Sequence, residues 1–485
     1  MNEKPLSRSS NIALKSGSAY MLSNILINAT SIITAPIFSR LLTTSDYGIV
    51  SNFMAWQSIG LILIGLGLAY TIGNAKIDFP GELNQFIASI QTLSSITGLI
   101  FLLFAILFVN PLSTLMELDK NLVIIIFIYL LLLPSVIYTQ EKSKFQLNYK
   151  KNISISIFNT VGSIIFCLLF IEFIFFKNRY MGRVIGLILP MSLLGIYFYY
   201  SILRNGWNLK MKFYWKYALK ISIPFIPHTL GMVVLTQLDR IMIIKIIGNS
   251  AAGLYSFGFS YASIIALFSN AISQAFQPWL YENYKNNKID QIKIATNNIT
   301  LGLSIIMIFL ISFGPEAIKI LGPKNFWDAK YVIMPIIIGS FFQYLAATYS
   351  TIQLYHKKTY FIPIGTILAA LINIGLNYFL IPIFGFKGAA FSTLISFLIQ
   401  ALFHMIVYKK ITNKIIYDDK YMWTIAISTT ILSYFIYMTY DLMLLRYLLS
   451  FGVFIFIFLF QKKNILDIIH NIFKILDISR FNLKK

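Results

Sequence analysis

The sequence predicts an all-α membrane protein with about fourteen spanning helices, and three observations support this fold class. Hydrophobic residues make up 57% of the 485 residues, charged residues only 12%, and the mean hydropathy is +0.73. A soluble domain carries about 25% charged residues. Apolar runs of about 20 residues, the length of a spanning helix, recur along almost the whole chain. The alternating pattern of a membrane β-barrel is absent. Because backbone groups in lipid must be paired internally, we expect the spans to be helices.

The predicted spans follow directly from these apolar runs. Their centres fall in 16–39, 47–72, 86–109, 121–140, 153–176, 181–203, 219–247, 250–276, 297–321, 331–354, 360–384, 387–408, 421–441 and 443–461. With the N-terminus in the cytoplasm, 28 of the 40 Lys and Arg residues lie on the cytoplasmic side. This bias follows the positive-inside rule, so we expect both termini in the cytoplasm. The loop with Lys177, Arg179 and Arg183 runs against the rule, as a local exception or an outward basic patch.

A weak internal repeat appears when the chain is shifted by 205 residues. The shift, which needs no gap, places Leu14-Lys15 on Leu219-Lys220, Arg40 on Lys245, Gly48 on Gly253 and Ser51 on Ser256. It joins span 1 with span 7 and span 2 with span 8, and both copies run outward from the cytoplasm, as in a parallel repeat. We therefore expect two six-helix bundles, over residues 1–210 and 211–415. Residues 416–485 would add two helices and a basic cytoplasmic tail.

The sequence lacks the motifs of most enzymes. No Walker A, HExxH, GxSxG or DxD pattern occurs, and no loop is long enough for a soluble domain. The one cysteine, Cys167, and the four scattered histidines form no disulfide or metal spacing. The net charge of +22 comes from short loops between apolar runs, which argues against nucleic-acid binding. We expect a protein that is not an enzyme, has no cofactor or metal, and works by binding and conformational change.

Polar side chains three or four residues apart form stripes along several spans. Amides facing lipid are costly, so these stripes should face the protein interior or water. Two interpretations remain open: the stripes hold helices together, or they line a hydrated cavity suited to sugar hydroxyls. The predicted polar lining consists of Asn24, Asn28, His228, Asn270, Gln274, Gln343, Asn373 and Asn377.

The seventh span carries two opposite charges, Asp239 and Arg240, in an apolar setting. Adjacent helical residues do not face each other, so each charge needs a partner of its own or water. We expect His228 to share a face with Asp239, because eleven residues separate them. Pro224 and Pro227 are the predicted hinge, since proline removes a helical hydrogen bond.

The expected ligand groups follow from these charges. Arg40, Arg240 and Lys245 are the candidate substrate-binding cations, and a diphosphate suits the bidentate fork of arginine. Asp239 and Glu172 are the candidates for coupling to an ion. The alternative is a charge pair at the membrane interface, with long basic side chains reaching toward the headgroups.

Three segments resemble one family. LDRIMIIKIIGNSAAGLYSFGFSYASII, APIFSRLLTTSDYGIVSNF and GFKGAAFSTLIS are similar to the helix 7–8, helix 1–2 and helix 12 regions of polysaccharide biosynthesis proteins that flip lipid-linked oligosaccharides. These proteins belong to the multidrug/oligosaccharidyl-lipid/polysaccharide exporter superfamily. The chain departs from its lipid II flippases in the first span, where Asn24 and Asn28 stand in place of an arginine.

The resemblance implies a MATE-like, V-shaped pair of six-helix bundles with alternating access in the bacterial inner membrane. It implies an undecaprenyl-diphosphate-linked glycan as substrate, moved from the inner to the outer leaflet for assembly of O-antigen of lipopolysaccharide or of capsule. It also implies a basic central cavity and coupling to H⁺ or Na⁺. Polymerase and chain-length proteins of the same pathway would be partners.

Three other functions remain open at this point. A multidrug cation antiporter of the same fold would need acidic residues deep in its spans, and Asp239 and Glu172 are the main candidates. A glycan polymerase or ligase would need a large outer loop with catalytic residues, and the sequence has none. A structural scaffold would not need polar stripes in both halves.

Overall fold

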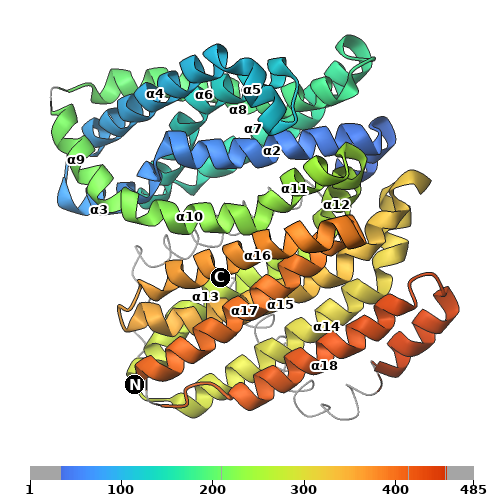
Figure 1. The fold of residues 1–485 in the computed structure, drawn as a ribbon. Coiled ribbons are helices and arrows are strands. Elements are labelled where there is room, and N and C mark those ends of the chain that lie inside the picture. Colours follow the sequence, from blue (N-terminus) through green and yellow to red (C-terminus); the bar gives the residue numbers. More distant parts are fainter. Residues whose placement is uncertain (1–33, 209, 413, 454, 456–485) are drawn as a thin grey trace, which may run out of the picture. The chain divides into compact units, whose positions relative to one another are not determined.

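The computed structural model describes residues 34–208, 210–412, 414–453 and 455, and every regular element in these ranges is a helix (Figure 1). Among them, 11 helices are long and apolar enough to cross a membrane, and a pair bent by 42° brings the number to 12. A shorter apolar helix, Met443–Val453, follows. The all-α membrane fold is confirmed. The number of helices is compatible with the fourteen predicted spans, because the first and last spans lie partly outside the described residues.

The chain forms two compact units. Unit 1 contains the residues up to Phe257 together with Ala370–Ala389, and unit 2 contains Gly258–Ala369 and the residues from Ala390 onward. The first helices are α2 (Thr44–Gly65), α3 (Ile72–Asp78), α4 (Leu83–Leu107), α5 (Val109–Met116), α6 (Lys120–Phe145), α7 (Tyr149–Leu169), α8 (Arg179–Gly206), α9 (Met211–Ser222), α10 (Ile226–Val233) and α11 (Asp239–Ile246). The others are α12 (Asn249–Ala262), α13 (Ile264–Lys285), α14 (Ile289–Leu321), α15 (Lys330–Tyr355), α16 (Phe361–Phe384), α17 (Phe386–Thr412) and α18 (Asp419–Met438).

Helices α9, α10 and α11 together make the seventh predicted span. In unit 1, α9 packs against α4, and α10 and α11 pack against α2. The first half of the chain and the seventh span thus share one compact unit. The division into bundles over 1–210 and 211–415 remains a prediction.

Helix α6 forms the centre of unit 1. Its sequence, with a run from Leu122 to Leu133 that is apolar all round, is typical of a buried helix. In an apolar stretch of 18 residues within this span, 67% of the residues are buried. Ser135 on α6 donates a 2.8 Å hydrogen bond to the carbonyl of Gly195 on α8. A Cβ atom at Gly195 would lie 2.9 Å from Cβ of Leu132, so glycine permits this close approach of α8 to α6.

The basic loop that runs against the positive-inside rule has structural partners. Arg179 donates a 2.9 Å hydrogen bond to the carbonyl of Leu41, at the end of the helical residues 34–41. Cζ of Arg183 lies 3.4 Å from the ring centroid of Phe38, and Nη1 of Arg183 lies 3.1 Å from Sγ of Cys167. A cation near helix C-terminal carbonyls is favourable. These contacts favour the interpretation as a local exception used for packing.

The two copies of the predicted repeat contact each other where α2 and α12 begin. A Cβ atom at Gly48 would lie 1.9 Å from the carbonyl oxygen of Asn249, and one at Gly253 would lie 1.9 Å from that of Thr44. Thr44 and Asn249 are the first residues of their helices and are related by the same shift of 205 residues. Oγ1 of Thr44 and Oγ of Ser250 are 2.7 Å apart. Each copy therefore presents its glycine to the first turn of the other copy.

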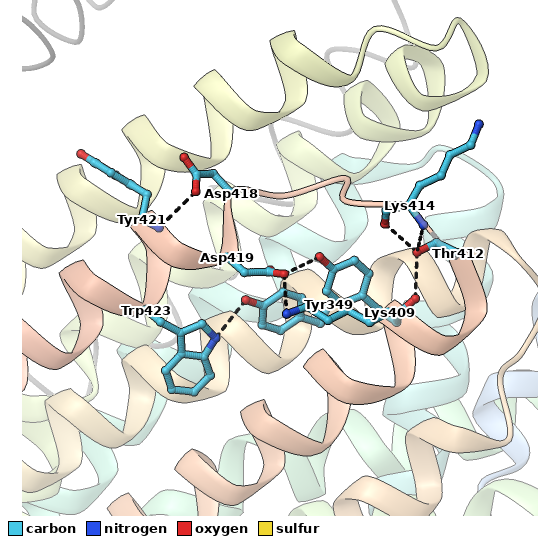
Figure 2. A network of polar contacts seen from close by, with 9 residues as sticks. Tyr349, Lys409, Thr412, Lys414, Asp418, Asp419, Tyr421 and Trp423 are labelled. Atoms are coloured by element: carbon cyan, nitrogen blue, oxygen red, sulfur yellow. Dashed lines mark hydrogen bonds and ion pairs between the residues drawn. The ribbon is translucent and has the colours of Figure 1, made fainter.

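Polar contacts attach the additional helix α18 to the rest of unit 2 near its start and just beyond its end. Near its start, Oδ2 of Asp419 accepts a 2.7 Å hydrogen bond from Tyr408 and lies 2.9 Å from Nζ of Lys409 (Figure 2). In the same network, Nε1 of Trp423 donates to the hydroxyl of Tyr349 at 3.2 Å.

Beyond the other end of α18, Lys330 pairs with Asp441 at 2.5 Å, and the buried Arg446 pairs with Glu316 on α14. Arg446 is almost fully buried, and removing Glu316 would leave its charge uncompensated, so this pair attaches the segment after α18 to α14. Asp441, in the other pair, is exposed.

Replacing Gly253 by alanine should destabilise the fold. The new Cβ atom would overlap the carbonyl oxygen of Thr44, and overpacking of this kind costs about 1–3 kcal/mol. Gly302→Ala is the matched control, because a Cβ atom there meets nothing within 4 Å. We expect a lower thermal unfolding midpoint for Gly253→Ala in detergent and no loss for Gly302→Ala. Equal midpoints for the two variants would contradict the close helix crossing.

Candidate functional site

Asp239 is a carboxylate buried within a span of unit 1, with 1% of its surface exposed. It is the first residue of α11, and its carboxylate accepts hydrogen bonds from side chains on two other helices. Oδ2 accepts from the hydroxyl of Tyr255 on α12 at 2.5 Å, and Oδ1 accepts from Nδ2 of Asn377 on α16 at 2.7 Å. Burying an unpaired charge costs several kcal/mol. These two donors offset that cost, and they connect three helices at one acidic side chain.

Two asparagine side chains extend this cluster along α16. Nδ2 of Asn377 also donates to Oδ1 of Asn373 at 3.1 Å, and both asparagines are fully buried. Oδ1 of Asn377 is buried without a hydrogen-bond partner among the described residues. Carboxylate and amide oxygens are the ligands that hard cations prefer. The described residues contain no group of three His, Cys, Asp or Glu side chains that could hold a metal ion.

Arg240 lies beside Asp239 and is also buried, with 7% of its surface exposed. Its Nη1 donates to the carbonyl of Thr236, one turn earlier, and its Cζ lies 5.7 Å from the ring centroid of Tyr255. The two charges thus have partners of their own, as the geometry of adjacent helical residues requires. Tyr255 contacts both, through its hydroxyl and its ring. In this structure Arg240 faces protein, and its binding to substrate remains a prediction.

The backbone before Asp239 is irregular. Residues Val234–Leu238 form a π-helical turn, and Ile223–Phe225 form a 3₁₀ turn next to the two prolines. Single π-turns inside α-helices are frequent at functional sites. The shared face of His228 and Asp239 assumed a continuous α-helix, which this turn interrupts, so it remains a prediction; His228 is half-buried. Pro224 and Pro227 are exposed where the helix is interrupted, and their role as a hinge remains a prediction.

The other predicted site residues that the structure describes lie on several elements of both units. Arg40 and Lys245 are exposed, and Nη1 of Arg40 donates to the carbonyl of Pro36 at 2.6 Å. Glu172 is exposed in a short π-helical turn after α7. In unit 2, Asn270 and Gln274 are exposed on α13 and Gln343 is half-buried on α15. Asn24 and Asn28 lie outside the described residues.

The polar stripe on α17 connects helices within unit 2. Its members are buried: Ser392, Ser396, Gln400 and His404. Nε2 of Gln400 lies 3.4 Å from Oγ1 of Thr366 on α16, and His404 contacts Gln353 on α15 at 3.1 Å. For this stripe the structure favours helix attachment over a hydrated lining.

Sequence reasoning missed Tyr255, whose hydroxyl donates to Asp239 and whose ring lies near Arg240. It stands 16 residues after Asp239 in the segment GLYSFG. The available signal was a tyrosine shortly after two charges in an apolar span, because tyrosine offers both a hydroxyl donor for a carboxylate and a ring for a guanidinium.

Comparison with known proteins relates the chain to a family. A model of the family described as polysaccharide biosynthesis protein matches residues 13–284. Capsular polysaccharide biosynthesis protein CapF of Staphylococcus aureus is 26% identical over 410 residues, which are 80% of this chain and 98% of that protein.

Two solved structures share the fold. Lipid II flippase MurJ in an inward closed conformation has a TM-score of 0.68 at 18% identity, and the match covers 93% of this chain and 100% of that chain. A multidrug resistance MATE family transporter of the MOP superfamily, in an inward-facing conformation, has a TM-score of 0.63 at 13% identity. That match covers 79% of this chain and 94% of the transporter chain. These likenesses confirm the MATE-like fold class. Because the family model matches more than half of the residues, the chain belongs to the polysaccharide biosynthesis protein family.

Proposed function

We propose that this protein moves an undecaprenyl-diphosphate-linked oligosaccharide from the cytoplasmic to the outer leaflet of the bacterial inner membrane, for assembly of capsule, O-antigen or a similar glycan. The observation that carries the proposal is the pair of buried charges, Asp239 and Arg240, within a span of a polysaccharide biosynthesis protein. Ionisable residues inside a membrane are expensive and mark functional sites. The names of two similar proteins, a capsular biosynthesis protein and a lipid II flippase, support a lipid-linked glycan.

Arg240 is the proposed contact for the diphosphate, with Arg40 and Lys245 as further cations. A guanidinium has five N–H donors, so a contact to a backbone carbonyl such as that of Thr236 leaves others for a phosphate. When the site opens, the substrate would replace the ring of Tyr255 beside the guanidinium of Arg240. The released product would pass to a polymerase and chain-length proteins.

Asp239 is the proposed coupling site for Na⁺ or H⁺. A ligand shifts a conformational equilibrium only by binding the two states differently. A cation or proton at this carboxylate would compete with the donors from Tyr255 and Asn377. It would thereby change how α11, α12 and α16 hold together, and this gives the ion a direct effect on helix packing.

The crossing of α2 and α12 is the proposed gate, closed in this structure. The reciprocal contacts of Gly48 and Gly253 leave no room between the two helix starts. Entry of a glycan on that side would require the helices to separate, so the crossing and the Asp239 site, which shares α12, would move together.

A multidrug cation antiporter is the second candidate. The buried carboxylate of Asp239 and the fold of the MATE family transporter favour it. The close packing of Asp239, which is buried against the donors Tyr255 and Asn377, disfavours an organic cation at the same place, because such a cation is far larger than Na⁺ or a proton. Loss of the protein would then change drug resistance and leave surface glycan intact.

Arg240→Ala should abolish surface glycan in a complementation assay while the protein remains in the membrane. Arg240→Lys should be partly active, because an ammonium group lacks the bidentate fork. Arg204→Ala, at an exposed arginine at the end of α8, is the control and should be fully active. Normal glycan with Arg240→Ala would remove this residue from the substrate site.

Asp239→Asn keeps the shape of the side chain but removes its charge. We expect transport driven by an imposed ion gradient in membrane vesicles to be lost. Na⁺ and pH gradients applied separately to the wild type identify the ion. A variant that responds to the same gradient as the wild type would overturn coupling at Asp239.

A disulfide between Thr44→Cys and Ser250→Cys should lock the proposed gate, because the two hydroxyl oxygens lie 2.7 Å apart. The native Cys167 is buried and should not interfere. We expect oxidation to stop glycan export and a reductant to restore it, whereas each single cysteine variant stays active. Full export by the cross-linked protein would show that this crossing does not open during transport.

A further inference from the structure

Helix α9 begins a span that is too long for the bilayer. The helical run Met211–Ile246 has 36 residues, which at 1.5 Å per residue is about 54 Å, against about 30 Å of hydrocarbon. The α9 end of this run is its polar end, with lysines at positions 212, 216 and 220. The 12 residues of α9 therefore extend into the headgroup region.

One face of α9 is attached to unit 1. Tyr214 and Ala218, four residues apart, are fully buried. The hydroxyl of Tyr214 donates to Glu82, and that of Tyr217 donates to Asp78. Two contacts lower the pKa of the Glu82 carboxyl: the hydrogen bond from Tyr214, which has the larger effect, and the ion pair with Lys210 at 3.3 Å. The acidic residues near α9 are thus engaged on this attached face.

The opposite face of α9 carries a stripe of unpaired lysines. Lys212, Lys216 and Lys220 recur every four residues and are exposed. Within the described part of the chain, none of their ammonium groups has a hydrogen bond or ion pair. Helix α9 contains no acidic residue. We call these three residues the lysine stripe; no carboxylate of the described residues pairs with it.

Two cavities of unit 1 border the lysine stripe and combine ammonium with apolar groups. A cavity of about 680 Å³ is lined by Lys212, Trp207, Phe213 and Trp215, among others. A second, of about 560 Å³, is lined by Lys216, Lys220 and apolar residues that include Ile223. Trp207 is 65% exposed and Phe213 58% exposed. Aromatic residues beside basic ones are typical of surfaces at headgroup level.

We propose that the lysine stripe binds the phosphates of anionic phospholipids in the leaflet where α9 lies. Charge complementarity and the apolar lining favour a phospholipid, because a free phosphate would gain nothing from Trp207 and Phe213. The bound lipid would hold α9 from the face opposite to Tyr214 and so fix the start of the span that carries Asp239. The inference does not depend on which substrate the protein transports.

The test compares lipids retained by the full-length protein in detergent. Phosphatidylglycerol or phosphatidylcholine is added, and native mass spectrometry measures the bound lipid. The test variant carries Lys212→Gln, Lys216→Gln and Lys220→Gln. The control carries Lys285→Gln, Lys288→Gln and Lys358→Gln, which remove the same charge from exposed lysines of unit 2.

We expect the wild type and the control to prefer phosphatidylglycerol. A lysine near an anionic surface contributes roughly fivefold in affinity, so the test variant should lose roughly a hundredfold. Arginine at the same three positions should restore the preference, because it keeps the charge. This variant also serves as a control for misfolding caused by substitution at these positions.

Three results would overturn the inference. Equal losses in the test and control variants would show a general effect of net charge. An unchanged preference in the test variant would place the lipid elsewhere. With undecaprenyl diphosphate as a third probe, loss of that lipid alone would assign the lysine stripe to the substrate instead.

Discussion

The structure of unit 1 depends on a carboxylate that must not be left unpaired in lipid. The cost of burying Asp239 is offset by donors on α12, the next helix, and on α16, which lies far away in the sequence. Asn377 belongs to the segment Ala370–Ala389, which includes most of α16 and the start of α17 and shares a compact unit with the first half of the chain. Tyr255 then places its ring near Arg240, so one residue serves both charges. The same contacts that stabilise the fold are therefore those that an ion or an anionic substrate would have to exchange.

The fold class followed from the sequence because the bilayer imposes strong and simple constraints. Length, apolarity and internally paired backbone leave helices as the solution, so the spans could be recognised one by one. The repeat was recognisable at Gly48 and Gly253 because a close helix crossing requires the absence of a side chain at both positions. The need of Asp239 and Arg240 for separate partners also followed from helix geometry.

The identity of those partners did not follow from the sequence, since it depends on packing between distant helices. A stripe such as Asn373 and Asn377 has the right spacing for a cavity lining or for helix attachment, and only its neighbours decide between them. The same holds for His404, which contacts Gln353. The π-helical turn Val234–Leu238 has no sequence signature of its own. It interrupts the continuous α-helix on which the inference about His228 was based. Arg179 and Arg183 showed that a charge count cannot separate topology signals from cations used for packing.

The reciprocal glycines also limit how the two copies of the repeat can diverge. Elsewhere the copies differ freely: Asp239 and Arg240 in one copy correspond to Thr34 and Ala35 in the other. At Gly48 and Gly253, however, each position is filled by the backbone of the other copy. A side chain gained by one copy cannot be relieved by a change of side chain in the other, since a carbonyl oxygen is present in every residue. The two copies are thus free to specialise in chemistry but remain bound to a common geometry at this one crossing.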